Sequence, residues 1–392
     1  MQTILFLHGA LVRTSRILLE GLSAFAAEQG WIVLNVAPPK CAKPNYLRRI
    51  AKSWDAAGIV VDCGVERSMP LPDGKLDVPV VCIDLDPQKR KKLLQRGARS
   101  INVAFVNADS DLFARMAANE LLKHDFLSYA YVSAYSSRHW SERRRDVFRQ
   151  VIESAGEALY IFDGKQQETG DSESSRRLGN WLSSLPKPCG LLAANDRIAA
   201  LVLSAAQRYG ISIPEMVSVI GIDNDDMLCE NLSTSLSSIN PDFFSGGYIA
   251  GQMLSKMISG AAPVDNPLLY GAKCFMHRLS TRRIERSVPS VKNALNYIHR
   301  HAAEGLSASD ILPLLGGSRR SAEKRFKAAC GKSILEEIID VRFQKLMPLL
   351  EQRHVSLCSL HCKVGFTSCN QLQRQFKARF GVSLSQYRKV LR

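Results

Sequence analysis

The feature that most constrains this chain is a change in its hydrophobic pattern near residue 280. Up to about residue 278, short apolar runs alternate with longer amphipathic stretches, beginning with TILFL (3–7), the stretch 17–30 and the run 31–37. Short apolar runs bounded by Gly, Pro and Asp are typical of buried strands, and the stretches between them have helical spacing. After residue 290 the strand-like runs disappear. An α/β part is therefore expected to precede an all-α part.

The alternation predicts parallel sheets with helices on both faces. Further strands are expected at 57–63, 78–84, 127–134, 158–164, 189–196 and 217–223, and helices at 111–125, 141–156, 176–185 and 198–210. The segment STRRIERSVPS is polar, basic and contains a proline, which is typical of a linker. We expect one domain at 1–278, a linker at 279–290 and an all-α domain at 291–392.

Charge is unevenly distributed between these parts. The 392 residues include 52 Lys and Arg and 37 Asp and Glu, and the range 291–392 holds 18 of the former and 7 of the latter, a net charge of +11. A last quarter with most of the positive charge suits a polyanionic partner, although solvated helix faces would give the same composition. Composition alone leaves both interpretations open.

Other compositional features favour a cytoplasmic protein with no membrane span. No run of about 18 apolar residues occurs, and the start MQTILFLHGALV lacks the basic region and cleavage site of a signal peptide. Ten cysteines occur without a C-x-x-C pair, so we expect reduced thiols rather than a disulfide framework.

The all-α part contains one motif twice. SAEKRFKAACGKSILEEI resembles QLQRQFKARFGVSLSQYR about fifty residues later. The expected helices 318–331 and 368–381 each follow a short helix and a glycine turn, as in a helix-turn-helix. In the second copy, Leu372, Phe376 and Phe380 form one apolar stripe.

Polar side chains off the apolar stripes are the expected DNA readers. Their guanidinium, amide and carboxylate groups can pair with base edges in a major groove. One such helix could be an ordinary amphipathic surface helix, but two basic copies favour double-stranded DNA as partner. The candidates are Arg319, Arg320, Glu323 and Lys324 in the first copy, and Asn370, Gln373, Arg374 and Lys377 in the second.

GFTSCNQLQRQFKARFGVSLSQYR resembles the signature of arabinose-activator-type (AraC/XylS) transcription regulators. The resemblance implies two recognition helices in successive major grooves, joined by a linking helix, here 334–351. Three residues depart from the pattern: Leu384 replaces a proline, Ala322 replaces a large apolar residue, and Pro348 is expected to interrupt the linking helix. These departures allow the two recognition helices to be spaced differently from those of the family.

The stretch GLLAANDRIAALVLSAAQRYGISIPEMVSVIGIDND resembles the lac-repressor and periplasmic-binding-protein type I sugar sensors. The resemblance implies a two-lobed sensor, and this order of domains resembles that of the xylose-operon activators. Ligands of such folds bind at the carboxyl ends of strands. The candidate ligand-binding residues are Arg16, Asp109, Arg144, Asp196 and Asp223, although each Asp could be a helix cap and the register at Arg144 could slip by one.

These features together predict a sugar-responsive transcription regulator, an activator more than a repressor, with a pentose such as xylose as effector. A homodimer is expected, and RNA polymerase is a further candidate partner. The rivals are a regulator sensing another small molecule and a sugar-processing enzyme tethered to nucleic acid. The sequence offers little support for the enzyme, because FLHGA (6–10) is not accompanied by the G-x-S-x-G motif that would supply a nucleophile.

No cofactor is expected. Cys358, His361, Cys362 and Cys369 resemble a zinc set, but their spacing is not that of a structural zinc site. We expect small buried thiols there instead, because free cysteine behaves as a small hydrophobe.

Overall fold

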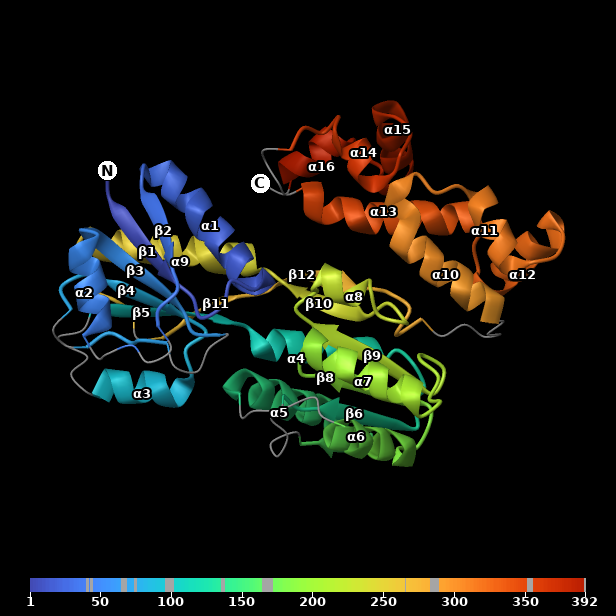
Figure 1. Cartoon of the computed structure of the whole chain (residues 1–392), viewed down its shortest axis with the longest axis horizontal. Coiled ribbons are helices and arrows are strands. Elements are labelled where there is room, and N and C mark those ends of the chain that lie inside the picture. Colours follow the sequence, from blue (N-terminus) through green and yellow to red (C-terminus); the bar gives the residue numbers. More distant parts are fainter. Residues whose placement is uncertain are drawn as a thin grey trace.

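The computed structural model describes the chain except residues 40, 41, 43, 44, 65–68, 74, 75, 96–101, 135–137, 164–171, 265, 283–288, 351–354, 391 and 392. It contains two α/β lobes and a helical part beside the second lobe (Figure 1). The predicted fold class is therefore confirmed. Among the described residues, no helix combines the length and apolarity needed to cross a membrane.

The first lobe is a six-stranded sheet in the order β11-β5-β4-β3-β1-β2, in which the paired strands are parallel. Its strands are β1 (Thr3–Leu7), β2 (Ile32–Val36), β3 (Ala56–Asp62), β4 (Val80–Ile83), β5 (Val103–Ala108) and β11 (Leu268–Tyr270). Side chains alternate between the two faces. Helices α1 (Arg13–Gln29) and α9 (Phe243–Ile258) supply residues to one face, and α2 (Tyr46–Ser53) and α3 (Pro87–Gln95) supply residues to the other.

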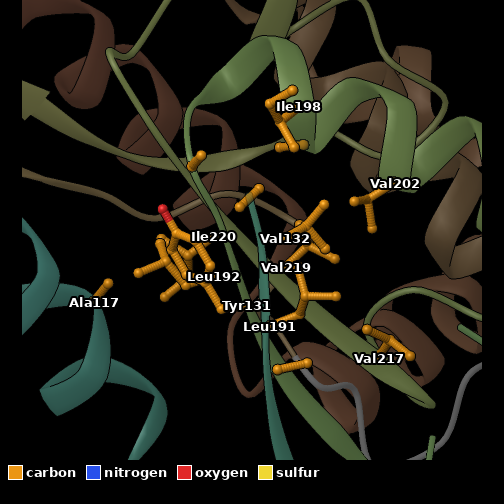
Figure 2. Packing of buried hydrophobic residues seen from close by; sticks show 14 of the residues in the cluster. Ala117, Tyr131, Val132, Leu191, Leu192, Ile198, Val202, Val217, Val219 and Ile220 are labelled. Carbon is orange, nitrogen blue, oxygen red and sulfur yellow. The ribbon is translucent and has the colours of Figure 1, made fainter. Parts of the chain in front are cut away.

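The second lobe has the sheet order β12-β10-β9-β8-β6-β7. Its strands are β6 (Ser128–Val132), β7 (Leu159–Phe162), β8 (Cys189–Ala193), β9 (Val217–Ile222), β10 (Ser237–Pro241) and β12 (Ala272–Met276), and β12 runs antiparallel to β10. Its helices are α4 (Ser110–Leu121), α5 (His139–Ser154), α6 (Ser172–Ser184), α7 (Asp196–Arg208) and α8 (Asp226–Cys229). Figure 2 shows its apolar core, where Leu191, Leu192, Val219 and Ile220 of the central strands pack together.

The described chain passes between the lobes three times, after β5, after β10 and between β11 and β12. Main-chain hydrogen bonds join these crossings: Asp109 N donates to Tyr270 O at 2.9 Å, and Asp242 N donates to Gly271 O at 2.8 Å. Three short, bonded connections of this kind are typical of a hinge between two lobes.

The helical part contains α10 (Pro289–His301), the short 3-10 helix η2 (Ala302–Glu304), α11 (Ala308–Leu315), α12 (Arg319–Cys330), α13 (Ile334–Leu350), α14 (Leu360–Val364), α15 (Cys369–Phe380) and α16 (Leu384–Val390). It has two apolar clusters, one around Phe326 and Ile338 and one around Phe343 and Phe376. Helix α13 contributes to both, so it is the linking helix between two similar modules.

Most predicted strands and helices agree with the structure to within a few residues. The start of the expected linker at residue 279 is packed rather than exposed. Leu279 and Ser280 are buried, and Ser280 Oγ donates to Val219 O of β9 at 2.6 Å. The stretch 283–288 of that linker lies outside the described residues. The domain boundaries at 278 and 291 stay predictions.

Candidate functional site

Two carboxylates, one buried and one half-buried, lie at the carboxyl ends of two strands of the first lobe. Asp62 ends β3 and accepts hydrogen bonds from Ser15 Oγ at 2.6 Å and Gly64 N at 3.0 Å. Asp84 follows β4 and accepts from Ala108 N at 2.7 Å and Tyr270 Oη at 2.8 Å. Burial raises the pKa of both carboxyls, against the effect of these hydrogen bonds. The first lobe therefore presents fixed acceptors at the edge where ligands of parallel sheets bind.

Arg144 of α5 is the buried cation of the second lobe, with a relative exposure of 5%. Its guanidinium donates to Ala194 O at 2.7 Å and lies 4.8 Å from the ring centroid of Trp140. Its Nε is buried without a hydrogen-bond partner among the described residues. The neighbours Arg143 and Arg145 instead pair with Asp111 and Asp146. A buried donor without a partner is costly, which distinguishes Arg144 from its two neighbours; its contact with a ligand stays a prediction.

Asp223 lies at the end of β9 in a left-handed backbone conformation, with φ of 117°. Burial raises the pKa of its carboxyl to about 7, while the charge of Arg144 acts in the opposite direction. Its main-chain carbonyl accepts a hydrogen bond of 2.9 Å from Arg13 of the first lobe. A strained acidic residue beside a buried arginine is typical of a functional site.

A cavity of about 280 Å³ lies between the lobes. The second lobe contributes residues from the start of α5, and the first lobe contributes residues that follow β3 and β4. His139 lies 3.6 Å from Asp86 across this gap, so the lobes are already in contact. The described lining includes Cys63, Gly64, Met69, Leu71, Leu85, Asp86, Gln88, Lys89, Lys92, Arg138, His139 and Trp140.

The other predicted ligand residues have different surroundings. Asp109 caps α4 by accepting from Leu112 N at 2.9 Å. Asp196 is buried and accepts from Ser238 Oγ at 2.6 Å and Asp225 N at 2.8 Å, so it fixes the loop that carries Asp223. Helix α1 begins at Arg13, not Arg16, and Arg16 is exposed. As ligand contacts these three residues stay predictions.

Sequence reasoning missed Asp62, Asp84, His139 and Trp140. Two of them had a signal: VVDC and VCID each end an apolar run with an aspartate, the same pattern that selected Asp223. His139 and Trp140 had none, because their role depends on the fold bringing the start of α5 opposite the first lobe.

The helical part contains the two predicted helix-turn-helix units, α11 with α12 and α14 with α15. Phe326 and Phe376 are fully buried. Gly365, in the second turn, has φ of 82°, and a Cβ there would lie 2.4 Å from Ala302 O, so this turn requires glycine. All eight predicted DNA readers are exposed, namely Arg319, Arg320, Glu323, Lys324, Asn370, Gln373, Arg374 and Lys377. Their contacts with bases stay predictions.

The three departures from the expected signature are accommodated. Helix α13 continues through position 348 to Leu350, so the expected interruption is absent. Leu384 begins α16 and is buried against the second cluster, and Ala322 is fully buried in the first. The expectation of buried thiols near α14 was wrong: Cys358 and Cys362 are exposed and Cys369 is half-buried. In the described part of the chain, no three His, Cys, Asp or Glu side chains are arranged to hold a metal.

The loop after β9 also contacts the helical part. Arg278 is buried and donates to Asn224 Oδ1 at 2.9 Å and to Asp226 Oδ1 at 3.1 Å. Glu230, just after α8, accepts from Lys345 Nζ of α13 at 2.8 Å. The segment 223–230, which we call the junction loop, therefore contacts Arg13 of the first lobe at one end and the linking helix at the other.

A second contact joins the parts through Glu337 of α13. Arg282 donates to Glu337 Oε1 at 2.6 Å, and His299 lies 3.7 Å from the same atom. Burial raises the pKa of Glu337, but its interactions with His299 and Arg282 outweigh burial and lower the pKa to about 2. The carboxylate thus anchors the end of the sensor to the linking helix.

Comparison with known proteins agrees with this architecture. A model of the periplasmic binding protein-like domain matches residues 118–281, and a model of a helix-turn-helix domain matches residues 314–390. The chain is 28% identical to the xylose operon regulatory protein of Haemophilus influenzae over 287 residues, which covers 72% of this chain and 74% of that protein. It is 27% identical to the Escherichia coli K12 protein of the same name over 256 residues, 65% of each.

Among solved structures, the xylose-binding transcription activator xylR superposes with a TM-score of 0.60 at 22% identity, covering 99% of this chain and 98% of that one. This likeness confirms the fold of both parts and their order. The matched domains are those of transcription regulators rather than enzymes.

Proposed function

We propose that a monosaccharide, with a pentose such as xylose favoured, controls the operator binding of this chain, which is a homologue of the xylose operon regulatory proteins. The observation that carries the proposal is the buried guanidinium of Arg144, which lacks a partner for its Nε and interacts with the Asp223 carboxyl of raised pKa. Arg144 packs against Trp140, which lines the interlobe cavity. The same chain exposes two basic recognition helices. An activator is favoured over a repressor.

The sugar would lie between Arg144 and Asp223 of the second lobe and the strand ends of the first. Sugar hydroxyls both donate and accept hydrogen bonds, so a guanidinium and a carboxylate suit them. The Trp140 ring adds an apolar face. A cleft whose polar groups are satisfied only by correctly placed hydroxyls discriminates between epimers.

The effector can act only through a difference in affinity between two states of the protein. Closure of the lobes would stabilise the contact of Arg13 with the Asp223 carbonyl and so set the position of the junction loop. The loop would pass this change to α13 through the pair of Glu230 and Lys345. The orientation of the helix-turn-helix units would follow.

On DNA, we propose that α12 and α15 read base edges in successive major grooves. Contacts of the basic last quarter with phosphates should make binding fall steeply with salt. We also propose a homodimer, an interaction with RNA polymerase and a location in the cytoplasm, where a transcription regulator meets its operator.

Calorimetry with a panel of pentoses and hexoses tests the effector. We expect one pentose to bind the wild type and to change its affinity for a duplex selected from a random library. Arg144→Met should abolish sugar binding, whereas Arg143→Met, a change at the exposed neighbouring arginine, should not. Turnover of a sugar would favour the enzyme, and the absence of any binding pentose or hexose would reject a sugar effector.

A further inference from the structure

Asp340 of the linking helix α13 pairs with cations from both modules of the helical part. Its Oδ2 accepts a hydrogen bond from Nζ of Lys332, which directly follows Gly331, the glycine that ends α12. Its Oδ1 lies 3.3 Å from Nη2 of Arg379, in the last turn of α15. One carboxylate therefore ties the ends of both proposed reading helices to the linking helix, with one oxygen for each.

Asp340 lies where α13 passes from one module to the other. Ile338 and Val341 belong to the apolar cluster of the first module, whereas Ile339 and Phe343 pack with the cluster of the second. The Asp340 side chain has a relative exposure of 18%, so its ion pairs are screened less than those of a fully exposed carboxylate. The carboxylate thus acts at the point where the orientation of one module relative to the other is set.

Arg342, two positions further along α13, makes a second tie between the modules. Its buried guanidinium donates to Ala302 O at 2.9 Å and to Leu306 O at 2.7 Å, both in the first module. It also lies 5.3 Å from the ring centroid of Phe366, in the turn before α15. Because residues two apart on a helix lie about 200° apart around its axis, the ties at Asp340 and Arg342 lie on nearly opposite sides of α13.

Two ties on opposite sides of a helix hold the modules against rotation, whereas the Arg342 tie alone would leave a hinge. We propose that Asp340 is a positioning residue that fixes the distance and angle between α12 and α15. It thereby selects operators by the spacing of the two DNA segments that one chain reads. This inference rests on the proposed function, in which both helices read base edges.

The spacing of the two segments is a sensitive measure of this stiffness. One inserted base pair moves the segments about 3.4 Å apart and rotates one relative to the other by about 35°. A rigid pair of reading helices cannot follow this change and loses one of its contacts. A loose pair follows it better but binds the matched spacing less tightly, because the effective concentration of the second helix at its segment is lower.

The test uses the full chain and a duplex that the wild type selects from a random library, with the two contacted segments located by footprinting. Derivatives of this duplex have one or two base pairs inserted or removed between the segments. Asp340→Asn should lower the ratio of matched to shifted affinity by about threefold, as expected for partly exposed ion pairs. Arg379→Gln, at an exposed side chain, should lower the ratio in the same direction. Asp340→Glu, which keeps the carboxylate, should retain most of the wild-type ratio.

Glu304→Gln is the matched control. It also removes a negative charge from the helical part, but Glu304 pairs with His301 of the same module. This variant should keep the wild-type ratio, which separates a general effect of charge on phosphate binding from an effect on spacing. Lys332 is a less clean target than Arg379, because it also lies 3.6 Å from Glu337.

An unchanged ratio in Asp340→Asn and Arg379→Gln would overturn the proposal. An equal loss of affinity at every spacing would do so as well, since that is the result of a merely structural role. A wild type that selects a duplex but shows no preference among the spacings would also overturn it. Failure of the proposed function looks different: the wild type would select no duplex, or footprinting would show one segment instead of two, and this inference would fail with it.

Discussion

Asp223 should make effector binding depend on pH between 6 and 8. Its pKa of about 7 arises because burial opposes ionisation more strongly than Arg144 favours it. About a tenth of these carboxyls are ionised at pH 6 and about nine tenths at pH 8. If the ionised form accepts the sugar hydroxyls, affinity rises roughly tenfold over this range, or about 1.4 kcal/mol. Because sugar binding releases a proton in this scheme, the affinity for the sugar grows as the pH rises through 7.

Calorimetry of the pentose at pH 6, 7 and 8 measures this effect directly. At pH 7 binding should release about half a proton, so the heat should depend on the ionisation enthalpy of the buffer. Asp223→Asn should remove both the pH dependence and the proton release. Asp146→Asn, at an exposed carboxyl of α5, should keep them. A wild-type affinity that is flat from pH 6 to 8 would refute the assignment of Asp223 as the acceptor.

Three further predictions concern the helical part. Glu337→Gln should destabilise the helical part by about 3 kcal/mol at pH 7 and by much less near pH 3, because the stabilisation from a lowered pKa is lost as the pH falls from about 4.5 to 2. Hydrogen exchange of α13 measures this loss, and equal losses at both pH values would contradict the prediction. Lys345→Ala should weaken the effector's influence on duplex affinity about fivefold while sugar binding without DNA is unchanged. Arg374→Ala should relax base preference as well as affinity in selection experiments, whereas a uniform loss would indicate a phosphate contact.

The fold could be predicted from the sequence largely because its signals are local. The run TILFL became β1, and its alternate residues face α1 and α2 on opposite sides of the sheet. The repeated motif placed α12 and α15, since both helices depend on one apolar stripe, a serine cap and a glycine stop. The expectation at Pro348 failed: α13 runs through this position to Leu350, although a proline beyond the first turn of a helix removes a main-chain hydrogen bond.

The cleft was harder to predict from the sequence, because its residues come together only through the three interlobe crossings. The strand-end rule selected Asp223 and should equally have selected Asp62 and Asp84, but it cannot tell an open carboxylate from one that caps a helix, as at Asp109. Burial separated Arg144 from its neighbours, and no pattern in the run SERRRD encodes which arginine turns inward.

The junction loop is where local chemistry and long-range contact meet. Asn224 follows Asp223 in the left-handed conformation too, with φ of 45°, and Asn224 holds Arg278, which also reaches Asp226. Two consecutive residues in a costly conformation persist only when surrounding contacts fix them. Here those contacts come from both sides, Arg13 of the first lobe and Arg278 in the segment leading to the linking helix. We therefore expect a change at either end to alter the other, which would give the sensor a physical route to the DNA-binding part.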